Sequence, residues 1–174
     1  MKKIFLLLAV VAGMTFTSCE GDQGPVGPQG ADGLPDGDTI AETFELQNVN
    51  FTLVEGEYMI RQNLNPVIFD SDVILIYRLA GTINASTPIW QPIPRTLYLN
   101  QGELDYDYDF SKQDFTIYAG GNYDIATTPQ FLNNQTFRIV IVPSDFSKTI
   151  DTNNFEAVTK ALKLTDQDFS KSQL

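Results

Sequence analysis

The sequence predicts an all-β domain, because two features recur along most of its length. Apolar and polar residues alternate with a period of two in short segments that are rich in β-branched and aromatic side chains. Turn-forming pairs such as Glu55-Gly56, Asn65-Pro66 and Gln101-Gly102 separate these segments, which recur about every 8 to 15 residues. Such a pattern is typical of an antiparallel sandwich or barrel, and we expect an antiparallel β-sandwich of the immunoglobulin-like or jelly-roll type over residues 39–164.

Eight segments carry the strand pattern. The clearest is 104–110, where four large side chains alternate with Asp105, Asp107 and Asp109. Segments 73–77 and 139–142 are continuously apolar, as expected of central strands that are covered on both faces. In chain order the expected strands are 40–47, 50–54, 58–64, 73–80, 95–99, 104–110, 115–119 and 137–142.

One short C-terminal helix is expected after the last strand. Asn153 can cap it, Glu156 lies three residues later as in a capping box, and apolar residues from Phe155 to Leu162 form one stripe. We expect this helix to cover an open end or an edge of the sheets. Residues 165–174 are predicted to form a polar C-terminal tail.

The first 18 residues have the pattern of a signal peptide. Lys2 and Lys3 precede an apolar stretch, 4–14, that is shorter than the roughly 20 residues a spanning helix needs. Cys19 is the only cysteine, and its place after the small pair Thr17-Ser18 resembles the bacterial lipobox, in which the thiol receives a diacylglycerol. We therefore expect Cys19 to be lipidated and to become the mature N-terminus. The alternative is an ordinary signal peptide whose cleavage site contains a cysteine.

Residues 19–38 combine this cysteine with a collagen-like linker. From Gly21 to Gly33 every third residue is glycine, as in the Gly-X-Y repeat of a triple helix. Five triplets are few, so we expect an extended spacer rather than a stable trimer. At ~3.1 Å per residue this spacer would hold the domain up to ~60 Å from the anchor.

Charge and composition argue against several classes of function. The formal charge is −11, and loss of residues 1–18 removes Lys2 and Lys3 but no acid, which makes it −13. This charge disfavours binding to nucleic acids or to anionic lipid surfaces. The chain has no histidine, which excludes Ser-His and Cys-His nucleophiles and His-ligated zinc. We expect a non-catalytic protein without a cofactor, and a small carboxylate-dependent hydrolase is the catalytic alternative.

Further motifs resemble those of lipoproteins from Bacteroidota-type bacteria. Glu20 and Asp22 resemble the signal that sends such lipoproteins to the outer face of the outer membrane. Asp38-Thr39-Ile40 resembles their acceptor motif for O-glycosylation, so Thr39 is a candidate glycosylation site. With the linker and segments 90–98 and 137–143, the chain resembles a family of small collagen-like lipoproteins of these bacteria. The resemblance implies a lipid-anchored, surface-exposed outer-membrane protein and carries no activity or catalytic residue.

The aspartate row of the strand at 104–110 is one candidate for a metal site. Asp105, Asp107 and Asp109 offer the carboxylate oxygens that Ca²⁺ prefers. Neighbours on one face of a strand are about 7 Å apart and point in parallel, whereas ligands must converge on the ion. We therefore interpret the row as a solvated face that protects a sheet edge, and we expect no metal.

Four aromatic residues, Trp90, Tyr98, Tyr118 and Tyr123, are candidates for a platform on which a sugar ring stacks. Packing in the core or at its rim is the alternative for each of them. Trp90 lies in an irregular, proline-rich segment, so we expect it to be the most exposed of the four. The sequence favours a surface lipoprotein with a structural or binding role, whose candidate partners are the membrane, a glycan and a surface protein. The alternative is a carbohydrate- or Ca²⁺-binding accessory module of an uptake system.

Overall fold

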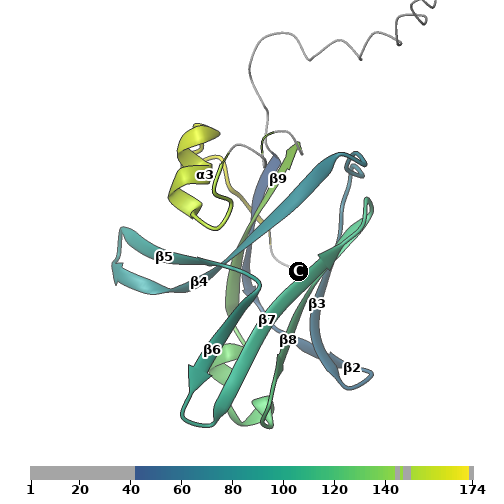
Figure 1. The fold of residues 1–174 in the computed structure, drawn as a ribbon, viewed down its shortest axis with the longest axis vertical. Coiled ribbons are helices and arrows are strands. Elements are labelled where there is room, and N and C mark those ends of the chain that lie inside the picture. The colour runs from purple at the N-terminus through teal and green to yellow at the C-terminus, as the bar shows by residue number, and fades with distance from the viewer. Residues whose placement is uncertain (1–41, 144–145, 147–149, 173–174) are drawn as a thin grey trace, which may run out of the picture. The chain divides into compact units, whose positions relative to one another are not determined.

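Two five-stranded sheets pack face to face in the computed structural model, which describes residues 42–143, 146 and 150–172 (Figure 1). The predicted signal peptide, Cys19, the linker and Thr39 lie outside the described residues. The elements are β1 (Glu42–Val49), β2 (Thr52–Val54), β3 (Glu57–Asn63), β4 (Asp72–Asn84), β5 (Thr87–Pro92), β6 (Arg95–Leu99), β7 (Gly102–Phe110), β8 (Asp114–Gly121), the 3₁₀ helices η1 (Ile125–Thr127) and η2 (Pro129–Phe131), β9 (Gln135–Pro143), α3 (Phe155–Ala161) and β10 (Ser170–Ser172).

The strand orders are β10-β1-β9-β4-β5 in the first sheet and β2-β3-β8-β7-β6 in the second. Neighbouring strands are antiparallel except for β10, which runs parallel to β1. The prediction of an all-β antiparallel sandwich with one short helix is confirmed, and the sheets do not close into a barrel. The strands with continuous apolar runs, β4 and β9, lie inside the first sheet, as predicted.

The main core lies between the two sheets and follows from the period of two. In β7, Leu104 and Tyr106 face inward and are fully buried, while Asp105 between them and Asp107 after them face solvent. Phe137 of β9 meets the ring of Tyr106 across the core at 6.5 Å between centroids. The Tyr106 hydroxyl donates to the carbonyl oxygen of Phe131 at 2.7 Å, so this buried polar group is satisfied. Burial of each such side chain contributes roughly 1.5–3 kcal/mol.

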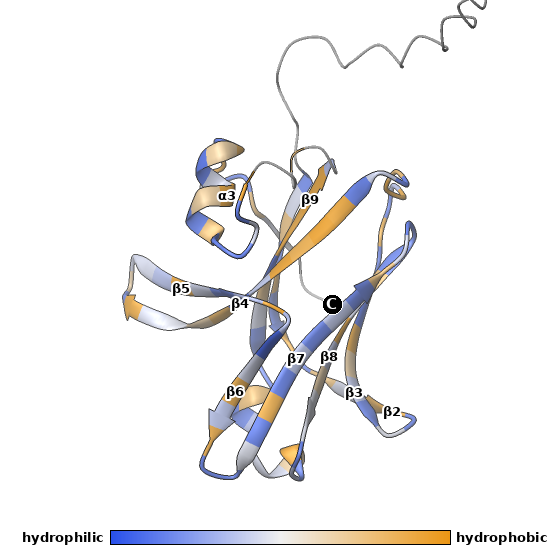
Figure 2. Cartoon of the chain, in the orientation of Figure 1, coloured by the Kyte–Doolittle hydropathy of each residue, from blue (hydrophilic) through white to orange (hydrophobic). Residues whose placement is uncertain are grey.

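A second, smaller core covers the outer face of the first sheet. Apolar residues on this face of β4 and β9 pack against Val158 of α3 and against Phe169, both of which are buried. The helix was predicted at an open end or an edge of the sheets. It contacts Trp90 of the edge strand β5 but lies on the outer face of the first sheet, not at an open end. The physical reason is that β4 and β9 are apolar on both faces, so the outer face also needs a cover. Figure 2 shows the continuous apolar stretch of β4 as an orange band.

Details of the C-terminal segment also differ from the prediction. The N-cap of α3 is Asn154 rather than Asn153, and its side-chain oxygen accepts from the backbone N–H of Ala157 at 3.1 Å. Residues 165–174 were expected to be a polar tail, but Phe169 is buried and Ser170–Ser172 forms β10. The burial of Phe169 and the pairing of β10 with β1 dock this segment on the sheet.

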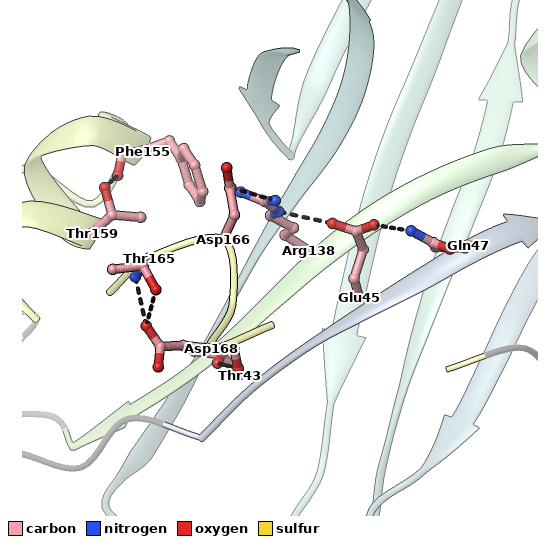
Figure 3. A network of polar contacts seen from close by, with 9 residues as sticks. All are labelled: Thr43, Glu45, Gln47, Arg138, Phe155, Thr159, Thr165, Asp166 and Asp168. Carbon is pink, nitrogen blue, oxygen red and sulfur yellow. Dashed lines mark hydrogen bonds and ion pairs between the residues drawn. The ribbon is translucent and has the colours of Figure 1, made fainter. Parts of the chain in front are cut away.

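Arg138 joins β9 to the C-terminal segment through a charge cluster in which Arg138 and Glu45 are buried and Asp166 is exposed (Figure 3). Its Nε lies 2.9 Å from Oε2 of Glu45 on β1, and Nη2 lies 2.8 Å from Oδ1 of Asp166. The side chains of Arg138 and Glu45 are each only 9% exposed. The guanidinium carbon lies 4.3 Å from the ring centroids of both Trp90 and Phe169, which is cation–π distance. This cluster therefore fixes the segment after α3 to the sheet.

Candidate functional site

A groove of about 590 Å³ lies at one end of the second sheet, between the turn that joins β2 to β3 and the segment that follows β8. Two of the four predicted aromatic residues, Tyr118 and Tyr123, line it. Its lining residues are Gly56, Glu57, Tyr58, Asp107, Tyr118, Ala119, Gly120, Gly121, Tyr123, Asp124 and Ile125. Another hollow, outside β2 and β3, contains Met59 and Arg61 but no aromatic side chain. The first groove therefore has the richer chemistry for binding.

Strand pairing places the side chains on the floor of this groove. Tyr118 of β8 pairs with Asp107 of β7, and both belong to the set of alternate residues that faces away from the core. The next residue of that set on β8 is Gly120, and a Cβ added there would meet nothing within 4 Å. Backbone is therefore bare beside the Tyr118 ring, so a flat ligand can approach closely.

The segment after β8 is held firmly and forms one wall. A Cβ on Gly121 would lie 2.6 Å from the carbonyl oxygen of Glu103, so only glycine fits where the chain leaves the sheet. Asp124 caps η1 by accepting from the N–H of Ala126 at 3.2 Å. The hydroxyl of Tyr123 lies 2.6 Å from Oγ1 of Thr128, a hydrogen bond that fixes its ring. A wall fixed in this way is preorganised for binding.

The groove is negatively charged. Glu57, Asp107 and Asp124 line it, and none of the lining residues is basic. Desolvation and the hydrogen bond that its hydroxyl donates to Asp109 at 3.0 Å raise the pKa of Tyr118, so this hydroxyl keeps its proton at neutral pH. Such a groove repels anions and offers carboxylate acceptors to hydroxyl or ammonium donors.

The other two aromatic candidates lie elsewhere, so the four do not form one platform. Tyr98 is 80% exposed on the edge strand β6 and does not line the groove. Trp90 lies on β5, half-buried, with its ring 5.8 Å from that of Phe155. The prediction that Trp90 is the most exposed of the four is wrong, because α3 and Arg138 pack against it. Its segment is a strand at a sheet edge, where prolines are tolerated, and its pairing with β4 contains two register shifts.

The aspartates on β7 are exposed, as predicted. The prediction that they protect a sheet edge is wrong, because β6 pairs with β7 and is itself the edge strand of that sheet. Asp105 accepts from the Thr96 hydroxyl at 2.6 Å, Asp107 from the N–H of Tyr108 at 2.8 Å, and Asp109 from Tyr118. Within the part of the chain that the structure describes, no three acidic residues are grouped so as to hold a metal ion. The described helices also include none that is long and apolar enough to cross a bilayer.

Sequence reasoning identified part of the groove and missed the rest. Tyr118 and Tyr123 stand out as aromatic residues, whereas Glu57 and Asp124 join them only through the pairing of β3 with β8 and the fold of the following segment. The Gly120-Gly121 pair, which follows an apolar strand, is the feature of the sequence that indicates backbone uncovered by side chains at the groove. No protein-family model, curated protein or solved structure matches the chain.

Proposed function

We propose that the protein is a lipid-anchored outer-membrane lipoprotein, exposed at the cell surface, whose β-sandwich is a non-catalytic binding module. The location is supported by the signal-peptide pattern, by Cys19 in a sequence that resembles a lipobox, and by the acidic residues that follow it. The resemblance to collagen-like lipoproteins supports the same location. On this proposal the Gly-X-Y segment is a spacer between the membrane and the domain.

The groove with Tyr118 at its floor is the observation that favours a binding role over a purely structural one. Its aromatic rings offer apolar faces, and Glu57, Asp107 and Asp124 offer acceptors beside them. A neutral carbohydrate fits this combination, because the C–H face of a sugar ring can stack on tyrosine while its hydroxyl groups donate to the carboxylates. Anionic glycans would meet repulsion from the same three carboxylates. The preferred ligand on this proposal is a neutral glycan.

The anchor is tested by growing cells with an alkyne-labelled palmitate. The protein with Cys19 intact should take up the label and sediment with the outer membrane, because diacylglycerol and further acyl chains bury many CH₂ groups at ~0.8 kcal/mol each. The Cys19→Ala variant should take up no label. Equal labelling and equal fractionation of the two proteins would contradict the anchor.

The groove is tested on an array of neutral glycans with the mature lipoprotein in detergent. For any glycan that binds, Tyr118→Ala should weaken binding roughly tenfold, which corresponds to ~1.4 kcal/mol of lost stacking. Tyr98→Ala removes an equally large, exposed ring outside the groove and should bind like the unmodified protein. Equal losses for the two variants, or a loss only for Tyr98→Ala, would place the site elsewhere.

A further inference from the structure

The opposite end of the sandwich carries a cluster of exposed apolar side chains, which we name the apolar tip: Val67 and Phe69 in the β3–β4 connection and Phe110 at the end of β7. Their exposed fractions are 59%, 79% and 41%. Figure 2 shows the β3–β4 connection with orange segments at this end of the fold. Large apolar side chains that cluster at the surface are typical of a binding surface.

Hydrogen bonds hold the apolar tip in this exposed conformation. Ile68, between Val67 and Phe69, is buried, and its N–H donates to the carbonyl oxygen of Lys112 at 3.0 Å. The N–H of Phe69 donates to Oδ2 of Asp72 at 2.9 Å. The inward position of Ile68 therefore directs its two apolar neighbours outward, since alternate side chains of an extended chain point to opposite sides.

The apolar tip lies beside the point where the chain enters the domain. Residues 42–44, at the start of β1, and residues 63–66, directly before Val67, line one shallow hollow. The strand register agrees, because Glu42 pairs with Ile141 and Asp72 pairs with Pro143, two residues further along β9. In Figure 1 the β3–β4 connection lies at the end of the sandwich where β1 begins. A chain that arrives from Cys19 therefore meets the domain next to this apolar surface.

Two of the acidic residues around the apolar tip form ion pairs, although the chain as a whole is strongly acidic. Asp70 lies 2.9 Å from Nζ of Lys112, and Asp114 pairs with Arg61. Asp72, whose carboxylate accepts from the N–H of Phe69, and Asp109, beside Phe110, keep negative charge at this end. This charge disfavours an anionic lipid surface, whereas aromatic and aliphatic side chains can partition at the headgroup depth of a zwitterionic one.

We propose that the apolar tip rests in the headgroup region of the lipid bilayer that anchors the protein, an inference that depends on the proposed lipidation of Cys19. The contact need not be strong by itself. On the proposed function, the linker at residues 19–38 attaches the domain to the bilayer, and attachment of this kind gives effective concentrations in the millimolar range at distances that the tether can span. Side chains that would bind lipid only weakly from solution are then held at the surface for much of the time.

A fluorescent probe at the apolar tip tests the proposal on the full mature lipoprotein. Lipidation blocks the thiol of Cys19, so Phe69→Cys provides a single site for an environment-sensitive nitrobenzoxadiazole label. The matched control is Ile83→Cys, which is also exposed, at 73%, but lies at the far end of β4. Both proteins are reconstituted in phosphatidylcholine vesicles with and without doxyl-labelled phosphatidylcholine. We expect the doxyl lipid to remove most of the emission at position 69 and to leave the emission at position 83 unchanged.

The outcomes separate the inference from the proposed function. If mass spectrometry shows acylated Cys19 and the probe at position 69 is not quenched by lipid, the inference is wrong while the anchor stands. Self-quenching between labelled copies without quenching by lipid would assign the apolar tip to a second copy of the chain. A protein without acyl chains would overturn the anchor and with it the membrane contact. Circular dichroism that matches the unlabelled protein ensures that each variant is folded.

Discussion

Replacing Arg138 by alanine should lower the free energy of unfolding by about 3–5 kcal/mol, the range for breaking one side of a buried ion pair. The variant leaves the carboxylate of Glu45 buried without its cationic partner. It also removes the guanidinium from between the rings of Trp90 and Phe169, and so loosens the segment that covers the outer face of the first sheet. We expect this loss because a buried, unpaired charge is poorly solvated.

Urea unfolding measures this loss, with the fluorescence of Trp90, the only tryptophan, as the probe of the cluster. The matched control is Arg61→Ala, which removes an arginine whose side chain is 67% exposed and pairs with Asp114 at the surface. That variant should change stability little. The double variant Arg138→Ala, Glu45→Gln should recover part of the loss, since no buried charge remains unpaired. Equal effects of Arg138→Ala and Arg61→Ala would contradict a buried, stabilising role for Arg138.

Stability should fall steeply above about pH 10, because buried tyrosines keep their protons in the folded protein. Burial raises the pKa of Tyr77, and it raises the pKa of Tyr106 to about 12 although Arg78 opposes the shift. Burial and the nearby Asp107 also raise the pKa of Tyr108. Above about pH 10 the unfolded chain releases these protons and the folded chain retains them. The stabilisation is complete below pH 10 and is lost as the pH rises toward the folded-state values, at about 1.4 kcal/mol per pH unit for each tyrosine.

For Tyr106 alone, the shift from about 10 to about 12 corresponds to a loss of roughly 2.7 kcal/mol that is complete only above the folded-state pKa, and Tyr77 adds to it. Urea titrations at a series of alkaline pH values give the slope of stability against pH. Tyr106→Phe should make this slope shallower by about 1.4 kcal/mol per pH unit, which corresponds to one proton fewer released on unfolding. Tyr98→Phe should leave it unchanged, because that hydroxyl is in solvent in both states. A slope that both substitutions alter equally would contradict the assignment to buried residues.

The strands were predictable where side chains alternate or where a run is continuously apolar. Residues 104–110 and 137–142 were recognised for these reasons and lie in β7 and β9. β5 was missed because Pro88 and Pro92 are rare within sheets, yet an edge strand tolerates them. A single sequence does not reveal which strand lies at an edge, since that depends on pairing between distant segments.

The contacts of the C-terminal segment were less predictable for the same reason. The stripe around Val158 predicted a helix but did not indicate the surface that it covers, which is set by the outer faces of β4 and β9. The docking of Phe169 depends on Phe155 and Arg138, and the parallel pairing of β10 with β1 joins residues more than 100 positions apart. At the groove, Tyr118 was recognised by residue type, whereas the approach of Glu57 required the register of β3 and β8.

The direction of β3 links the two surfaces. This strand begins at Glu57, in the groove, and ends at Asn63, beside the hollow next to the apolar tip. Its seven residues span about 20 Å at ~3.3 Å each. If Val67 and Phe69 contact lipid, Tyr118 therefore lies at the end of the domain that points away from the bilayer. A long polymer attached to another surface could then bind at Tyr118 without contacting the bilayer.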